Sequence, residues 1–258
     1  MFYDSYVPQP PLSHLIHNIW YVEGHAPTLR KQRHLPTGMA EIVMNLSPGP
    51  GNPIFAGPFS EHFNFELNGP TCVLGVQFKS GGAFPLLKLP TSELHNLHVP
   101  LQDVWGTKGP ELRERLMPAS TPMARFKIME QFLLSQICNP MGLDPAVSFA
   151  LQRFQATPDE CTVSRIVETT GLTHRRFGQL FSRQVGMKPK LFLRLQRFQR
   201  AIWKAEGQQD VDWANLAIDC GYFDQAHLIH NFQEFAGLTP ESWLALRHES
   251  PFLINLDS

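Results

Sequence analysis

The sequence has no apolar run long enough to cross a membrane, because none of its hydrophobic stretches approaches the roughly eighteen residues that a spanning helix needs. The first residues, MFYDSYVPQPPLSH, carry no positively charged stretch followed by an apolar one, so they do not predict a secretory signal. We therefore expect a cytoplasmic protein with no membrane partner. At 258 residues the chain is long enough for two domains, each with its own core.

Cysteines and enzyme motifs are also scarce. The cysteines are far apart in sequence, which excludes a knuckle or redox pair of neighbouring thiols and predicts reduced, mostly buried side chains at Cys72, Cys138, Cys161 and Cys220. The chain has no G-x-S-x-G, no phosphate-binding loop, no H-E-x-x-H and no dinucleotide glycine pattern. We therefore predict no catalytic residue, no cofactor, no metal site and no enzymatic activity.

The net charge is −1, which by itself argues against a protein that coats nucleic acid, but the charges are unevenly placed. Residues 161–205 hold ten Lys or Arg and a single acid, Glu168. Residues 206–258 hold nine acids and a single base, Arg247. This asymmetry indicates two neighbouring segments whose surfaces differ in role.

The first part of the chain predicts short strands over 17–23, 40–46, 54–56, 62–67 and 72–79. Clusters of Pro, Gly and Asn separate them, such as SPGPGNP (47–53) and NGP (68–70). Short strands with no long helix between them favour an antiparallel sandwich or small barrel. From about residue 106 the spacing becomes helical, over 111–117, 123–138 and 145–156, and we place a domain boundary near 155–160.

A repeat follows at an offset of 51 residues. THRRFGQLFSRQVGMKP (173–189) aligns with DQAHLIHNFQEFAGLTP (224–240), and each segment begins with an N-cap residue and ends in Gly and Pro. Each follows a short turn with a glycine, Gly171 or Gly221, and each turn follows a short helical run. A helix, a glycine turn that lets two helices cross steeply, and a second helix form a helix-turn-helix unit, so the sequence predicts two of them.

A helix predicted over 189–205 joins the two units. One side of it is apolar and the other is basic, with Arg194, Arg197, Arg200 and Lys204. The basic side is suited to DNA phosphates, and the alternative is an ordinary solvated helix surface.

Residues 160–245 resemble the DNA-binding domain of AraC/XylS-type transcription regulators. The resemblance rests on IVETTGLTHRRFGQLFSRQVGMKPKLFLRLQRFQRA and on LAIDCGYFDQAHLIHNFQEFAGLTP, where Gly221-Tyr222, Asp224-Gln225 and Thr239-Pro240 are specific to the family. It implies a sequence-specific regulator that binds double-stranded DNA. The second helix of each unit would lie in successive major-groove segments, about one helical turn or ~34 Å apart.

The resemblance, together with the basic side of the linker helix, gives these candidate DNA-binding residues: His174, Arg175, Arg176, Gln179, Arg183, Arg194, Arg197, Arg200, Gln225, Ala226, His227 and His230. Gln179 and His230 replace the arginine of many members, the residue best suited to bidentate contact with guanine, and Gly178 has no side chain to read a base. We expect base readout in the first unit to be weak or centred on Arg175. Two interpretations of the charge asymmetry stay open: the first unit and linker anchor the protein, or the acids of the second unit simply face away from DNA.

Residues 10–138 resemble a sensor domain of unknown ligand that precedes this DNA-binding domain in some members. Shared features include Trp20, Glu41-Ile42, Gly57-Pro58 and Trp105-Gly106. The resemblance implies a cupin-like β domain able to hold a small-molecule effector, with His34, Glu41, Phe55 and Phe78 as candidate ligand contacts. The alternative is a cupin-type metalloenzyme domain fused to a DNA-binding module, although the His-x-His run with a following carboxylate is missing.

We therefore expect an α+β protein of two domains, an antiparallel sandwich or barrel with following helices and an all-α domain. The expected ranges are 1–106 for the sensor domain, 107–156 for a helical linker or subdomain, 157–248 for the double helix-turn-helix domain and 249–258 for a tail. Expected partners are DNA, an effector, a second copy of the chain and, for an activator, RNA polymerase. The sequence leaves activation or repression open.

Overall fold

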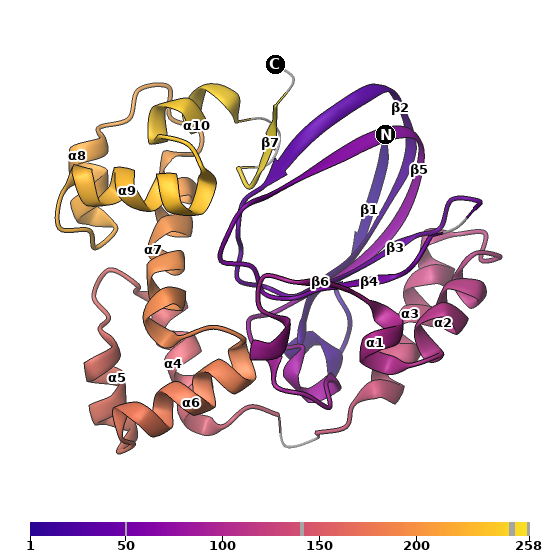
Figure 1. Ribbon diagram of the computed structural model, residues 1–258, viewed down its shortest axis with the longest axis horizontal. Helices are drawn as coiled ribbons and strands as arrows, with labels where there is room; N and C mark the ends of the chain where they lie inside the picture. Colours follow the sequence, from indigo (N-terminus) through magenta and orange to yellow (C-terminus); the bar gives the residue numbers. More distant parts are fainter. Residues whose placement is uncertain (50, 140–141, 248–250, 257–258) are drawn as a thin grey trace.

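The computed structural model describes residues 1–49, 51–139, 142–247 and 251–256. Figure 1 shows a curved sheet whose one side is covered by three helices, and a second group of helices that lies beside the sheet and is built around the long helix α7 (Pro189–Ala205). Among the described residues no helix is long and apolar enough to cross a bilayer.

Within the described residues the sheet has seven strands, and every pair in it is antiparallel. The order is β1-β2-β5-β3-β4-β6, and β7 pairs with β2. The strands are β1 (Phe2–Tyr6), β2 (Ile16–His34), β3 (Glu41–Asn45), β4 (Ile54–Ala56), β5 (Phe63–Phe78), β6 (His98–Pro100) and β7 (Leu253–Asn255). The expected antiparallel β domain is confirmed, and its strands form one curved sheet.

The expected turn at NGP (68–70) is wrong, because β5 runs through it as a single strand. Gly69 pairs with Ala26 of β2, opposite a register shift between Ala26 and Arg30. A φ of 72° at Gly69 lets the backbone deviate there without ending the strand. The long β2–β5 pair satisfies the backbone groups of both segments, which outweighs the local turn preference.

The first core lies between the sheet and the helices that follow it. These are α1 (Leu101–Trp105), α2 (Lys108–Leu116) and α3 (Pro122–Gln136), with short 3-10 turns at Leu12–His14, Phe84–Leu86 and Thr91–Leu94. Ile19, Ile42 and Phe55 from the sheet pack with Phe126 and Leu133 of α3, all with no exposed area. Burial of each such side chain stabilises the fold by roughly 1.5–3 kcal/mol.

The second core holds the other helices together: α4 (Pro145–Ala156), α5 (Val163–Thr170), α6 (His174–Val185), α7, α8 (Trp213–Asp219), α9 (Gln225–Ala236) and α10 (Pro240–Leu246). Helix α4 contributes Val147, Leu151 and Phe154 to this core. The segment 107–156, expected as one linker, is therefore divided, with α2 and α3 in the first core and α4 in the second.

The C-terminal segment expected as a tail contains β7, which extends the sheet at β2 through Gln32, Arg33 and His34. Ile254 of β7 is fully buried in the second core. The strand therefore ties the helical domain to the sheet. Cys161 and Cys220 are buried as expected, whereas Cys138 is exposed at the end of α3, where the chain leaves the first core.

Candidate DNA-binding surface

The first helix-turn-helix unit is formed by α5 and α6. Thr162 and Thr173 cap the two helices, and each hydroxyl accepts a hydrogen bond from the N–H three residues later. Gly171 ends α5 in the left-handed region with a φ of 68°, where a side chain would be strained. Phe177 and Phe181 of α6 are fully buried and fix the inward face of the helix.

The second unit repeats this arrangement in α8 and α9. Asp224 caps α9 as Thr173 caps α6, and the N-cap and both ends of α9 lie 51 residues after those of α6. Gly221 has a φ of 77°, and a Cβ there would lie 2.6 Å from the Cα of Asp159, so conformation and space both require glycine. The predicted double helix-turn-helix is confirmed in its element bounds.

The outer face of α6 is strongly basic. Its sequence-predicted contact residues are all exposed: His174, Arg175, Arg176, Gln179 and Arg183. Arg165 of α5 and Lys188 and Lys190 at the start of α7 are exposed beside it. These last three were absent from the predicted site, although the count of cations in 161–205 contained them. In the described part of the chain no residue forms a hydrogen bond or ion pair with any of the six Lys and Arg side chains of this group, namely Arg165, Arg175, Arg176, Arg183, Lys188 and Lys190.

The outer face of α9 is less basic. Ala226, His227 and His230 are exposed and Gln225 is half-buried. The His230 Nε2 lies 3.9 Å from the carboxylate of Glu234 on the same helix. This face offers hydrogen-bonding groups of moderate length and no Lys or Arg.

The predicted phosphate stripe on α7 needs correction, because its arginines bind other parts of the helical domain. Arg194 donates to Asn231 at 3.1 Å, pairs with Glu234 and lies over the ring of Phe235. These contacts join α7 to α9, and they use the guanidinium that the sequence assigned to DNA.

The next two arginines of the stripe bind the chain between α4 and α5. Arg197 donates to the carbonyl oxygens of Pro158 (2.8 Å) and Cys161 (3.1 Å). Arg200 pairs with Asp159 at 3.4 Å. One turn later Lys204 pairs with Asp219 of α8, also at 3.4 Å. Helical periodicity placed these side chains on one face but could not show that other segments cover it.

The four candidate ligand residues of the sheet domain fall on two faces. Phe55 and Phe78 are fully buried in the first core, against the helices. Glu41 lies in the same cross-strand row as Gln77, on the opposite face, and accepts a hydrogen bond of 2.7 Å from the amide of Gln77. His34 belongs with Glu41, since the two interact electrostatically. The structure thus brings together His34 and Glu41 and separates them from both phenylalanines.

Aromatic rings surround His34 on this open face. His34 stacks on Phe63 at 5.1 Å between ring centroids, and His98 contacts Phe63 at 4.8 Å and Phe59 at 4.6 Å. Burial lowers the pKa of His34 and of His98, and the Glu41 carboxylate opposes the shift in both. Neutral imidazoles among aromatic rings beside a carboxylate could bind a ligand with an apolar body and a hydrogen-bonding group.

The sheet domain contacts the two helix-turn-helix units at equivalent points. Thr91 donates to the carbonyl of Gln184 at 3.2 Å, at the end of α6. Arg33 donates to the carbonyl of Ala236 at 2.9 Å, at the end of α9, where His62 also lies 3.3 Å from the carbonyl of Phe235. In Figure 1 the C-terminal ends of α6 and α9 both point toward the sheet. The sequence carried no signal for these contacts, because they depend on how the domains pack.

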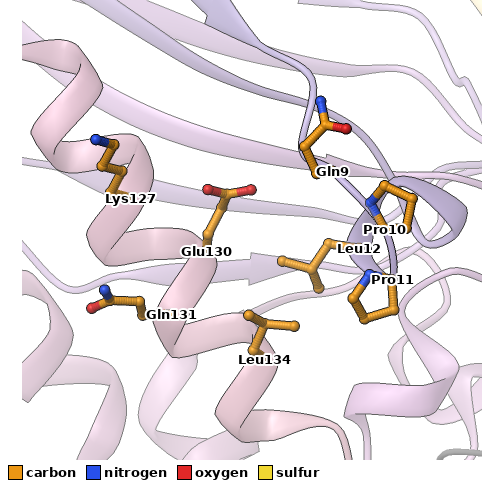
Figure 2. A pocket seen from close by; sticks show the side chains of 8 residues that line it. All are labelled: Gln9, Pro10, Pro11, Leu12, Lys127, Glu130, Gln131 and Leu134. Atoms are coloured by element: carbon orange, nitrogen blue, oxygen red, sulfur yellow. The ribbon is translucent and has the colours of Figure 1, made fainter.

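A small hollow of about 280 Å³ lies far from these helices, between α3 and the segment before β2. Figure 2 shows Glu130 and Leu134 on the side of α3 that faces Pro11 and Leu12, whereas Lys127 and Gln131 project away. The Glu130 carboxylate already accepts a hydrogen bond of 3.1 Å from the hydroxyl of Tyr6. Lys127 is the other charged residue among those that line the hollow.

Two family profiles match the chain. One, described as a helix-turn-helix domain, matches residues 166–245, and the other, described as a domain of unknown function (DUF6597), matches residues 4–100. The first match begins within α5 and covers the rest of both helix-turn-helix units and the helix between them. Residues 166–245 are thus an AraC-type helix-turn-helix domain. The chain is a DNA-binding transcription regulator.

Solved structures similar to the regulator have low identity and TM-scores below 0.5. The C-terminal domain of AraT, a response regulator from Geobacillus stearothermophilus, is 19% identical with a TM-score of 0.39 over 42% of this chain and 90% of that one. The DNA-binding domain of AdpA, in complex with a target DNA, is 20% identical with a TM-score of 0.36 over 40% and 91%. ToxT from Vibrio cholerae is 10% identical with a TM-score of 0.41 over 94% and 98%. No curated protein matches the chain.

Proposed function

We propose that the regulator binds two adjacent major-groove segments of duplex DNA through the N-terminal halves of α6 and α9. The observation that carries this proposal is the equivalence of the two helices. They have the same length and the same type of N-cap. Their C-terminal ends face the sheet domain. At the opposite ends His174 and Arg175 of α6 and Ala226 and His227 of α9 are exposed. An exposed helix end of this kind can enter the major groove.

The two units would contribute differently. Phosphate neutralisation supplies most non-specific affinity for DNA. The six unpaired cations belong to α5, α6 and the start of α7, and the first unit therefore acts as the electrostatic anchor. The second unit, with neutral or weakly basic side chains, would contribute mainly sequence preference. Of the two interpretations left open by the sequence, we favour this one, with the linker arginines removed from the anchor.

Selection from a randomised duplex library tests the proposal. Full-length protein is incubated with the library at two salt concentrations, and bound sequences are recovered. We expect two short elements about one helical turn apart, and an affinity that falls steeply with salt. Arg175→Ala should weaken the base preference within one element, and Gln225→Ala should weaken it within the other. Each substitution should reduce the free-energy difference between the preferred and the wrong base by about 1–3 kcal/mol. Failure to enrich any sequence at either salt, with both full-length protein and residues 142–258, which keep α4 in the helical core, would contradict the proposal.

We further infer that a small-molecule effector binds the open face of the sheet and acts on DNA binding through the contacts at the ends of α6 and α9. His34, Glu41 and the aromatic rings near them supply the ligand chemistry. His34 also lies on β2 one residue after Arg33, which donates to Ala236. A ligand that moves this part of β2 would therefore move the contact with α9.

The contact hypothesis has its own test. Arg33→Gln together with Thr91→Val removes a hydrogen bond at each of the two helix ends. We expect the pair to change the preferred spacing between the two selected elements, or to broaden it, because the sheet domain no longer fixes the helix positions. An unchanged spacing preference in a folded double variant would contradict control through these contacts. A homodimer, RNA polymerase as the partner of an activator and a cytoplasmic site of action remain proposals of the same kind.

A further inference from the structure

Gly178 occupies the middle of α6, where nothing in the protein requires a glycine. The residue lies within the helix His174–Val185 and does not have a positive φ. A Cβ added at Gly178 would meet no heavy atom within 4 Å outside its own helix. Glycine in a helix interior is destabilising relative to alanine, because it loses more backbone freedom on folding. The sequence therefore carries a cost at this position that the protein's own packing does not explain.

The space beside Gly178, where other residues would have a side chain, is part of a hollow on the outer surface of the first unit. The hollow has a volume of about 480 Å³ and lies between α6 and the starts of α5 and α7. Apolar side chains line part of it, including Val163 and Pro189. Arg175, Gln179, Lys188 and Lys190 also line it.

The positive charges around the hollow favour a negatively charged ligand. Arg175 comes from α6, and Lys188 and Lys190 come from the start of α7. All three are exposed, and they belong to the six cations that bind no other described residue. An apolar hollow beside Lys188 and Lys190 fits a deoxyribose ring and the phosphates on either side of it.

The second unit differs at the equivalent position. Counting 51 residues from Gly178 gives Ile229, which is half-buried on α9. The two units therefore share cap positions and helix ends but not the space at the middle of the outer helix. This difference agrees with the larger number of free cations in the first unit.

We propose that Gly178 is a positioning residue that admits one sugar–phosphate strand of the duplex against α6, with Lys188 and Lys190 on its phosphates and Arg175 directed to the base edges. The proposal rests on the proposed function and names the part of the DNA that this surface holds. A side chain at position 178 would keep the strand away from the helix and lengthen the phosphate contacts of both lysines. The effect would be nearly independent of base sequence, because phosphates carry no sequence information.

Two substitutions test the proposal, Gly178→Ala and Gly178→Ile, the second of which introduces the residue found in the other unit. Gln102→Ala, an exposed change in α1, is the matched control. Affinity is measured on the selected duplex and on a scrambled duplex, and thermal unfolding is followed in parallel. We expect Gly178→Ala to raise Tm by about 2 °C and to weaken binding to both duplexes by a similar factor, about tenfold. Gly178→Ile should weaken both further, and the control should change neither.

Three results would overturn the proposal. Unchanged or tighter binding by both variants would show that the space is not used. Weaker binding to the selected duplex alone would show that the hollow holds a base edge instead of a strand. Absence of salt-dependent DNA binding by the wild-type protein would contradict the proposed function itself. The rise in Tm of Gly178→Ala would persist in that last case, so the two failures are distinguishable.

Discussion

The two helix-turn-helix units share a backbone plan and differ in surface. Their outer helices have the same length, the same type of N-cap bond and the same left-handed glycine at the C-terminal end. No described residue pairs with the cations of the first unit, whereas in the second Glu234 pairs with Arg194 and lies near His230. Backbone geometry thus constrains the caps, the turn glycines and the buried face, while the outer face is free to diverge. The divergence suggests that one unit provides affinity and the other specificity.

The largest expected effect comes from removing unpaired cations of the first unit. Neutralising Arg165, Lys188 and Lys190 together as glutamines should lower the magnitude of the slope of log K against log salt by about 3, because each phosphate contact contributes about 0.9. Affinity should fall on selected and scrambled duplexes alike. The measurement is a titration at four or more salt concentrations. A slope equal to that of the wild type would mean that these cations do not contact phosphates and that the first unit is not the electrostatic anchor.

Replacing an arginine of the linker helix α7 should lower stability and leave the salt dependence of DNA binding unchanged. Arg197→Gln removes a guanidinium that donates to the carbonyls of Pro158 and Cys161, so we expect the free energy of unfolding to fall by about 2 kcal/mol. The salt slope of DNA binding should stay the same. Denaturant unfolding and the same salt titration check both parts. A smaller salt slope with an unchanged free energy of unfolding would mean that Arg197 contacts DNA phosphates, as the sequence predicted.

The caps test the equivalence of the two backbones. Thr173→Ala and Asp224→Ala each remove a side chain that accepts a hydrogen bond from an N–H in the first turn of an outer helix. Each should lower the free energy of unfolding by about 1 kcal/mol. If one variant loses several kcal/mol and the other loses nothing, the units are not the structural equivalents that their offset suggests.

The smallest effect concerns pH and belongs to the sheet domain. Burial lowers the pKa of His34, His62, His95 and His98. A lowered pKa favours the neutral form in the folded state, so the stabilisation is present above the ordinary histidine pKa of about 6.5 and is lost as pH falls below it. We expect Tm to fall between pH 7.5 and pH 5.5, and His34→Gln to reduce that fall. A Tm that rises toward pH 5.5 would contradict the direction.

Local signals explain which parts of the fold could be predicted. The caps at Thr173 and Asp224 and the glycines at 171 and 221 act within a few residues of themselves, and the sequence predicted both units from them. The strand β7 and the continuous β5 depend on pairing with β2, far away in sequence, and were missed. The same limit applies to the site. Exposure of α6 followed from periodicity, but the partners of Arg194, Arg197 and Arg200 come from other segments that periodicity cannot place.

The salt dependence of wild-type binding to a duplex without any selected element tests the account most directly. Such binding depends on phosphate contacts alone, so its slope counts the cations that reach DNA. The six free cations of α5, α6 and the start of α7 predict a slope of about −5 for log K against log salt. A slope near −9 would mean that all ten cations of residues 161–205 contact phosphates, including those that the structure pairs internally. A slope near zero would mean that the first unit does not anchor the protein on DNA.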